Sequence, residues 1–209
     1  MLAAAPPNVD GASAAAQRTL RDASRATEVI KRLRSMFTRS EPVIEPLNLS
    51  EAVREVLALS SSDLQRNGVI VQTALANKLP PVMGDRIQLQ QVMLNLILNA
   101  SDALRGISDR PRRLIISSGF DQDQSVHLTV EDNGIGISRE VATRLFEPFF
   151  TTKVAGMGIG LSISRSIIES HGGRLWAIPK DNGPGAVFCF SVPTWTDHTR
   201  LGEMPVREA

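Results

Sequence analysis

The sequence predicts an α+β fold in which helices pack against a sheet. Hydrophobic residues make up 42% of the 209-residue chain and charged residues 22%, which is enough apolar material for a folded core. Amphipathic, helix-length segments alternate with short strand-like runs that end at turn-forming residues. At about 150 residues per domain, the length corresponds to one to one and a half domains.

The first forty residues differ from the rest. Residues 14–39 contain no Gly or Pro, and apolar or small residues recur at steps of three and four between Leu20 and Phe37. We therefore expect an amphipathic helix with a narrow apolar seam at 1–40, suited to a helical hairpin or a dimer bundle. The alternative is a surface helix of the main domain. Two Glu-Pro pairs then predict a linker at 41–47.

The main domain is expected at 48–193. Asn48 and Asp85 each precede a helical pattern and have a Glu or Gln three residues later, so they predict capped helices over about 48–65 and 85–104. Further helices are expected from about 139 and over 161–170. Strand-like runs at 69–75, 113–118, 125–131, 174–178 and 186–192 predict an antiparallel sheet. The tail, 194–209, has no periodicity and is expected to be disordered.

Composition excludes several classes of function. Lys plus Arg is 23 and Asp plus Glu is 22, and a net charge of +1 argues against a nucleic-acid binder held by bulk charge. The single cysteine, Cys189, excludes an internal disulfide and a cysteine-cluster zinc site. No apolar run approaches the roughly 20 residues that span a bilayer, so no membrane contact is expected.

Polar residues follow one face of the predicted helix at 85–104. Gln91, Asn95, Asn99 and Asp102 are separated by steps of four, four and three. An Asn side-chain oxygen suits Mg²⁺, which prefers hard oxygen ligands and retains waters and phosphate oxygens around it. A helix whose polar face is exposed to solvent and binds no ligand explains the pattern equally well.

A second motif, residues 131–137, directly follows a half-buried strand. Asp132 would be a buried acceptor for an amino group such as that of adenine, and the glycines Gly134 and Gly136 allow the backbone to approach a ligand closely. Taken alone, an ordinary Asn-Gly turn is the favoured explanation.

Two more motifs follow. Residues 146–153 hold three of the seven Phe residues and a Lys, Lys153, that could reach a phosphate. They suit a flexible flap with an apolar anchor, or alternatively a helix end packed on the core. Residues 156–161, Gly-Met-Gly-Ile-Gly-Leu, run into a helix, whose N-terminal N–H groups attract phosphates. A lone glycine triplet is a weak signal, and this one is neither a Walker A loop nor a dinucleotide fingerprint.

Together and in this order, the motifs resemble those of the ATP-binding domain of bacterial two-component sensor histidine kinases. The resemblance covers about residues 48–193. Residues 91–100 resemble the family's N box, 132–136 its first glycine box, 146–153 its F box and 156–161 its second glycine box. Residues 171–176 resemble its closing strand.

The resemblance implies a Bergerat-type fold, a two-layer α/β sandwich with helices on one face of a mixed sheet, and ATP between the N-box helix and a lid. Asn99 would ligate Mg²⁺ and Asn95 would contact the phosphates or their water, and these two are the candidate catalytic residues. Asp132 would accept from the adenine amino group in a base pocket that Gly134 and Gly136 shape. The other candidate ATP-binding residues are Asp102, Phe146, Thr152, Lys153, Gly156, Met157, Gly158, Gly160 and Leu161.

The N-terminal helix resembles the second helix of the family's dimerisation and histidine-phosphotransfer hairpin. The acceptor histidine of the family sits on the first hairpin helix, and none of His127, His171 and His198 lies in such a place. We therefore expect a cytoplasmic catalytic fragment that phosphorylates a histidine of its parent kinase for relay to a response regulator receiver domain. A homodimer remains an open alternative.

Two other classes of function are alternatives to this expectation. One is a different ATPase or serine kinase of the same superfamily, which is disfavoured because the ATPases commonly carry a glutamate base at the place of Asn95. The other is a non-catalytic interaction module, which the presence of Asn99, Asp132 and the lid glycines disfavours.

Overall fold

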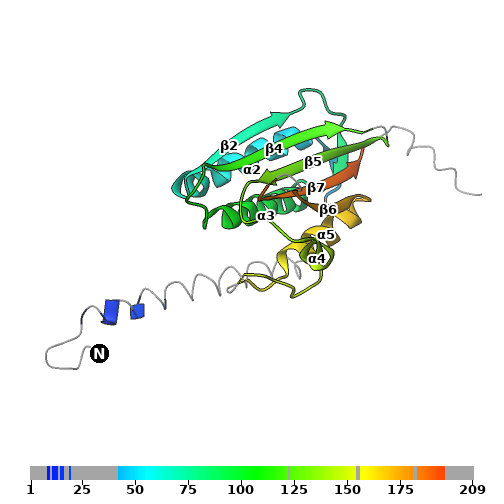
Figure 1. Cartoon of the computed structure of the whole chain (residues 1–209). Coiled ribbons are helices and arrows are strands. Elements are labelled where there is room, and N and C mark those ends of the chain that lie inside the picture. Colours follow the sequence, from blue (N-terminus) through cyan, green and yellow to red (C-terminus); the bar gives the residue numbers. More distant parts are fainter. Residues whose placement is uncertain are drawn as a thin grey trace, which may run out of the picture. The chain divides into compact units, whose positions relative to one another are not determined.

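The computed structural model describes residues 9, 11–13, 15, 16, 19, 42–121, 123–153, 156–180 and 183–195. The chain divides into two compact units, Met1–Pro42 and Val43–Ala209 (Figure 1). In the first unit, residues 9, 11–13, 15, 16 and 19 are helical. The apolar seam predicted between Leu20 and Phe37 lies outside the described residues.

A five-stranded mixed sheet forms one layer of the second unit. Its strand order is β2-β4-β5-β7-β6, with β2 parallel to β4 and the other pairs antiparallel. The expectation of an antiparallel sheet is therefore wrong at β2, because the connection from β2 to β4 contains a long helix, as a parallel pair requires. The strands are β2 (Val69–Leu75), β4 (Arg112–Phe120), β5 (Ser125–Asp132), β6 (Arg174–Pro179) and β7 (Ala186–Pro193).

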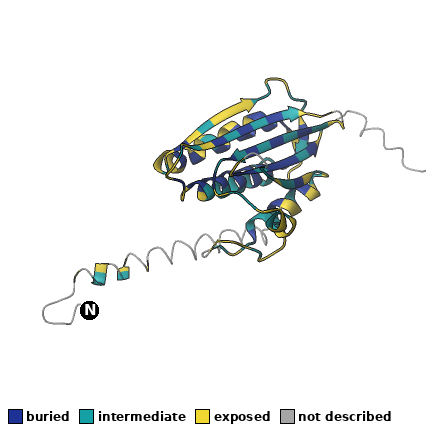
Figure 2. Ribbon diagram, in the orientation of Figure 1, coloured by how far each residue is buried: buried dark blue, intermediate teal, exposed yellow. Residues whose placement is uncertain are grey.

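Helices cover one face of this sheet, which confirms the predicted two-layer α+β architecture (Figure 1). Leu114, Leu128 and Phe190 point to this face from the three central strands and are almost completely buried. Figure 2 shows the buried residues gathered where the helices meet the sheet. The helices are α2 (Leu49–Arg66), α3 (Arg86–Leu104), the short α4 (Arg139–Arg144) and α5 (Gly160–Ser170).

Both predicted N-caps are confirmed. Asn48 Oδ1 accepts from the backbone N–H groups of Ser50 and Glu51 at the start of α2. Asp85 Oδ1 accepts from Gln88 N at 3.0 Å at the start of α3. These bonds satisfy N–H groups that the first turn of a helix otherwise leaves without partners, so the sequence fixes both helix starts locally.

A second, two-stranded sheet was not predicted. β1 (Glu45–Leu47) pairs antiparallel with β3 (Val82–Gly84), so a strand occupies part of the expected linker at 41–47. Leu47 and Val82 are buried at this pairing, and the apolar burial outweighs the breaking tendency of Pro46, which an edge strand tolerates.

The first two residues of the expected tail, Thr194 and Trp195, are hydrogen-bonded to the folded domain. Thr194 N donates to Gln124 O and Trp195 N donates to Pro81 O, both at 2.9 Å, so these two residues continue the folded domain. The remainder of the expected tail, 196–209, lies outside the described residues.

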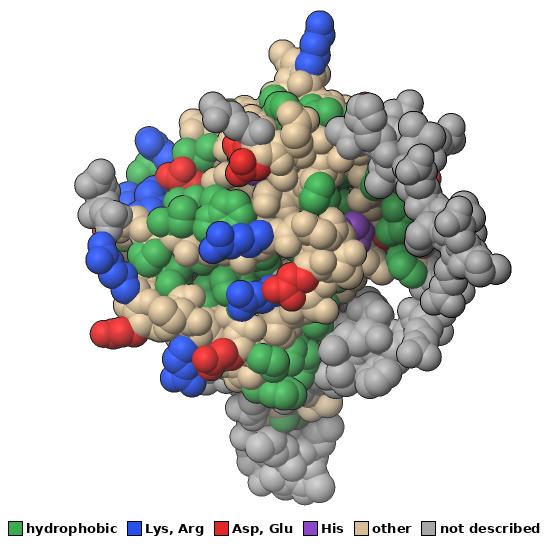
Figure 3. All heavy atoms as spheres, turned by 90° about the vertical axis from the view of Figure 1, so that its right-hand side faces the viewer, with side chains coloured by type: hydrophobic (Ala, Val, Ile, Leu, Met, Phe, Trp, Pro, Cys, Tyr) green, Lys and Arg blue, Asp and Glu red, His purple; other side chains and the backbone are tan. Residues whose placement is uncertain are grey.

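The surface agrees with the near-neutral charge of the sequence. On the face that Figure 3 draws, basic and acidic side chains are interspersed. Among the described helices, none combines the length and the apolar character needed to cross a bilayer.

Candidate functional site

The polar residues predicted on the N-box helix lie along one side of α3, where it meets α5. Asn95 is half-buried, and its Nδ2 donates to Ser164 Oγ of α5 at 2.9 Å. Ser164 Oγ in turn donates to Gly160 O at 3.0 Å, in the first turn of α5. Asn95 therefore ties the middle of α3 to the start of α5.

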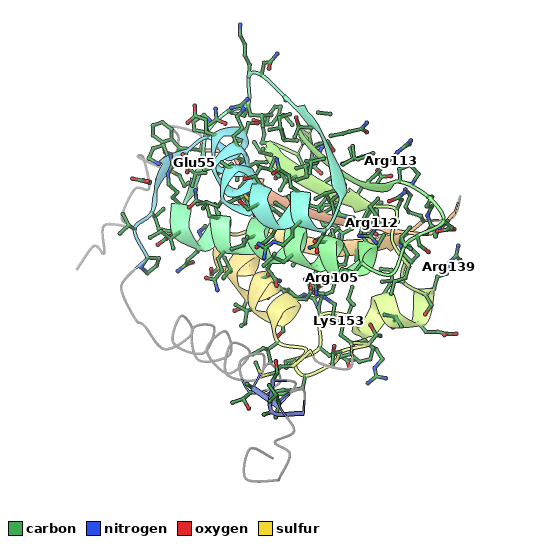
Figure 4. All side chains as sticks on the ribbon, turned by 90° about the vertical axis from the view of Figure 1, so that its left-hand side faces the viewer. Glu55, Arg105, Arg112, Arg113, Arg139 and Lys153 are labelled. Carbon is green, nitrogen blue, oxygen red and sulfur yellow. The ribbon has the colours of Figure 1, made fainter. Side chains whose placement is uncertain are left out.

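One turn further along α3, two oxygens meet a single cationic atom. Lys153 Nζ donates to Asn99 Oδ1 and to Asp102 Oδ2, both at 2.9 Å (Figure 4). Arg105 Nη1 lies 3.6 Å from the other oxygen of Asp102. The Lys153 and Asp102 side chains are 43% and 39% exposed, so water reaches this cluster.

The oxygens of this cluster fit a hard divalent cation. Within the described residues, no group of three or more His, Cys, Asp and Glu side chains could hold a metal ion. A cation here would take amide and carboxylate oxygens from α3 and complete its coordination with water and phosphate oxygens, which is how Mg²⁺ is usually held.

Asp132 closes β5 and is buried, with only 2% of its surface exposed. Burial raises the pKa of its carboxyl above the usual value, while N–H bonds from Gly134 and Ala186 and the charge of Lys180 act in the opposite direction. Asp132 Oδ1 accepts from Gly134 N at 2.8 Å. A buried carboxyl of this kind is an acceptor for a ligand N–H group.

The first glycine box is held in place by two neighbouring segments. Arg110 Nη2 donates to Asn133 O and to Gly134 O, both at 3.1 Å. From the other side, Ile135 N donates to Ala103 O of α3 at 3.3 Å. Arg110 was not predicted as a site residue, because its only signal in the sequence is a cluster of arginines between the predicted helix and strand.

A hollow of about 260 Å³ opens beside the first glycine box. It is lined by residues 135–138, by Lys180 and by 183–185. Lys180 also pairs with Glu131, next to Asp132. Residues 180–185 were not predicted to be part of the site, because their Gly and Pro residues predict only a turn.

Some residues of the F box, 146–153, are buried in the core and others are exposed at the surface. Phe146 is 9% exposed and packs in the core, with the Arg165 guanidinium 5.3 Å from its ring centroid. For this residue the structure favours the packed helix end over a nucleotide contact. Phe149 is 79% exposed, and Thr152 and Lys153 are also exposed; of these, Lys153 reaches α3.

The second glycine box brings the start of α5 against α3. Gly158 has φ +68°, and a Cβ there would lie 2.4 Å from Phe150 O. At Gly160 a Cβ would lie 2.7 Å from Asn95 Oδ1, so the missing side chain allows this close approach. Among the described residues no side chain caps the N-terminus of α5, whose N-cap residue is Ile159, and this leaves backbone N–H groups for an anion. Gly156 and Leu161 are half-buried in this segment, and Met157 is exposed.

Residues 84–196 match the model of the histidine kinase-, DNA gyrase B- and HSP90-like ATPase family. The chain belongs to this family.

Within the family, its relatives include sensor histidine kinase TmoS of Ectopseudomonas mendocina, which is 35% identical over 90% of this chain and 19% of TmoS. Sensor protein FixL of Bradyrhizobium diazoefficiens is 38% identical over 187 residues, which cover 90% of this chain and 36% of FixL. The catalytic domain of histidine kinase ThkA is 35% identical, with a TM-score of 0.63 over 72% of this chain and 95% of that domain. ThkA in complex with response regulator protein TrrA gives a TM-score of 0.69 at 30% identity, over 84% and 49% of the two chains.

The second unit is therefore a histidine kinase catalytic domain, an ATP-binding kinase domain, and the resemblance drawn from the sequence is confirmed. The chain spans about a third of the length of FixL. Around α3 the kinase fold gathers Asn95, Asn99, Asp102, Lys153 and Gly160.

The described histidines of the kinase domain lie away from this cluster. His171 accepts from Asp85 N through Nε2 at 3.0 Å, and its Nδ1 lies 2.7 Å from Ile167 O. His171 is the C-cap residue of α5. His127 lies in the middle of β5 opposite Gly119, and His198 lies outside the described residues.

Proposed function

We propose that this domain binds Mg²⁺-ATP against α3 and donates the γ-phosphoryl group to a histidine of its parent sensor kinase. The phosphoryl group then passes to an aspartate of a response regulator receiver domain. The observation that carries the proposal is the convergence of Asn99, Asp102 and Lys153 at one end of a surface that also holds Asn95 and the start of α5.

The nucleotide base belongs at the Asp132 end of this surface. Asp132 accepts from the adenine amino group, and the hollow lined by Gly136 and Gly185 receives the ring. Arg110 keeps the loop in shape by binding its carbonyl oxygens. Gly134 completes the base pocket.

The phosphates belong at the other end. Asn99 Oδ1 is the proposed Mg²⁺ ligand, and bound Mg²⁺ supplies charge neutralisation of the triphosphate. Asn95 orients the phosphates or their water, Lys153 contacts a phosphate oxygen, and the N–H groups at the start of α5 take another. Positioning and charge stabilisation of this kind provide most of the catalysis in phosphoryl transfer.

The acceptor imidazole comes from the hairpin helix of the parent kinase. Its nitrogen attacks the γ-phosphorus, the bond from that phosphorus to the β–γ bridging oxygen breaks, and ADP leaves. The receiver-domain partner is supported by ThkA, which is solved in complex with a response regulator protein.

The test combines nucleotide binding with phosphotransfer. Calorimetry with ATP, in Mg²⁺ and in a chelator, is expected to give binding that Asn99→Ala weakens about ten- to a hundredfold in Mg²⁺ only, since one charged-group contact is worth about 1.5–3 kcal/mol. Asn77→Ala, a change at an exposed loop residue, is the matched control. An unaltered affinity of Asn99→Ala for Mg²⁺-ATP would remove the metal assignment.

The phosphotransfer assay supplies radiolabelled ATP with and without a separately expressed acceptor hairpin. Acid-labile, base-stable label is expected on the hairpin only. Label on this chain alone contradicts the proposed division of labour, and free phosphate released without any acceptor indicates an ATPase of the same superfamily instead.

A further inference from the structure

The proposed cation site already holds a cation of the protein's own. Lys153 Nζ sits 2.9 Å from both Asn99 Oδ1 and Asp102 Oδ2. These are the two α3 side-chain oxygens at that end of the site, and the lysine reaches them from a segment more than fifty residues further along the chain. The ammonium therefore makes the contacts that a divalent cation needs.

An ammonium and a divalent cation cannot share this pair of oxygens. Both seek the same hard oxygen lone pairs, and they would repel one another at the short distance that two shared ligands impose. Arg105, beside the second oxygen of Asp102, adds a further positive charge against an incoming cation.

We propose that Lys153 and the divalent cation exclude one another at the Asn99–Asp102 oxygen pair, so that the cation enters together with the nucleotide phosphates and not before them. This rests on the proposed binding of Mg²⁺-ATP. The phosphates, with several negative charges, draw the lysine off α3 and onto a phosphate oxygen. The oxygen pair is then open to the cation that the phosphates carry.

Two consequences separate this arrangement from a simple surface ion pair. The nucleotide-free domain binds divalent cations weakly because of Lys153, although its oxygen pair is preformed. The lysine also matters most to nucleotide affinity when no divalent cation is present, since the phosphates then have no bound cation to neutralise them and depend more on the charge of Lys153.

The first test titrates nucleotide-free protein with Mn²⁺ and measures free Mn²⁺ by electron paramagnetic resonance. Lys153→Met is expected to bind Mn²⁺ about two- to fivefold more tightly than wild type, the range of a partly exposed ion pair. Lys153→Arg keeps a competing charge and is expected to stay near the wild-type value. Lys78→Met, at an exposed loop lysine, removes the same charge elsewhere and is the matched control.

Adding Asp102→Asn to Lys153→Met locates the cation, because it is expected to cancel the gain in Mn²⁺ affinity. Equal Mn²⁺ affinity of Lys153→Met and wild type overturns the proposal. So does an equal gain in Lys78→Met, which would mark a general charge effect, or a gain that survives Asp102→Asn, which would place the cation elsewhere.

The second test measures the ATP affinity of wild type and Lys153→Met in chelator and in Mg²⁺. The loss caused by Lys153→Met is expected to be about two- to fivefold larger in chelator than in Mg²⁺. An equal loss in both conditions, or none in chelator, refutes the transfer of the lysine to the phosphates. Failure of wild type to bind Mg²⁺-ATP at all would instead count against the proposed function, and the Mn²⁺ titrations would still decide the exclusion.

Discussion

Replacing Asp132 by Asn tests two consequences of its burial: the strength of its hydrogen bond to adenine and the cost of its charge to the stability of the domain. The substitution keeps the shape of the side chain and one acceptor oxygen, but it removes the charge. Because the carboxylate is 2% exposed and burial raises its pKa, the charge costs the nucleotide-free domain stability, whereas a bound adenine amino group would benefit from it.

The effect on ATP binding follows from hydrogen-bond strength. A bond to a charged acceptor contributes about 1.5–3 kcal/mol and one between neutral groups about 0.5–1.5 kcal/mol. The difference of about 1–1.5 kcal/mol predicts ATP binding about five- to tenfold weaker in Asp132→Asn. Since the ionised carboxylate is the stronger acceptor for the amino group, wild-type affinity should rise with pH through the folded-state pKa, and that of Asp132→Asn should not.

Asp132→Asn weakens ATP binding but is expected to gain stability relative to wild type as pH rises. The folded state holds the Asp132 proton more tightly than the unfolded state, so the stability that Asp132 contributes is fully present below the unfolded pKa, about 3.9, and is lost as pH rises through the folded pKa. Each pKa unit of elevation removes about 1.4 kcal/mol of stability at neutral pH. Asp132→Asn lacks this loss, so its stability relative to wild type should improve from pH 4 to pH 7.

Urea unfolding and calorimetric ATP titration at several pH values check both effects. Asp63→Asn, which removes an exposed carboxylate of α2, is the control. If Asp132→Asn and wild type gave parallel pH profiles in both measurements, or if Asp132→Asn bound ATP as tightly as wild type, Asp132 would not be the adenine acceptor.

Three further outcomes are expected. Gly158→Ala should lose about 1–2 kcal/mol of stability in urea unfolding, because its positive φ and its contact with Phe150 O admit no Cβ without strain; unchanged unfolding would contradict this. His171→Ala should lower stability by about 1–3 kcal/mol, since it leaves Asp85 N without a partner, and a melting temperature equal to wild type would argue against that role. Arg110→Met should weaken ATP binding about three- to tenfold in calorimetry with little change in melting temperature, and the reverse pattern would mean that Arg110 serves the fold alone.

The sequence predicts best those structural features that depend on residues close together in the chain. The capped starts of α2 and α3 depend on Asn48 and Asp85 and on partners two or three positions away. The alternation in β5 likewise predicts which side of that strand is buried, and the structure buries Val126, Leu128 and Val130. Motif order then gives the family, and with it the layer arrangement.

Features that depend on distant pairing could not be predicted. β1 pairs with β3 across α2 and β2, and three-residue strands leave too short a pattern to detect. Lys153 reaches Asn99 and Asp102 from 54 and 51 positions away, so charge complementarity suggests a link to phosphate but not to these oxygens. Phe146 could be assigned to a flap or to the core, and only the packing decides for the core.

The hydrogen bonds of His171 have a chemical consequence for a kinase domain. Ile167 O can only accept, so the ring carries its proton on Nδ1, and the lone pair on Nε2 is directed at Asp85 N–H. An imidazole attacks phosphorus through a free nitrogen lone pair, and this ring has none to offer. By tying both nitrogens into the helix-end contacts, the fold leaves His171 without a free lone pair for nucleophilic attack on phosphorus.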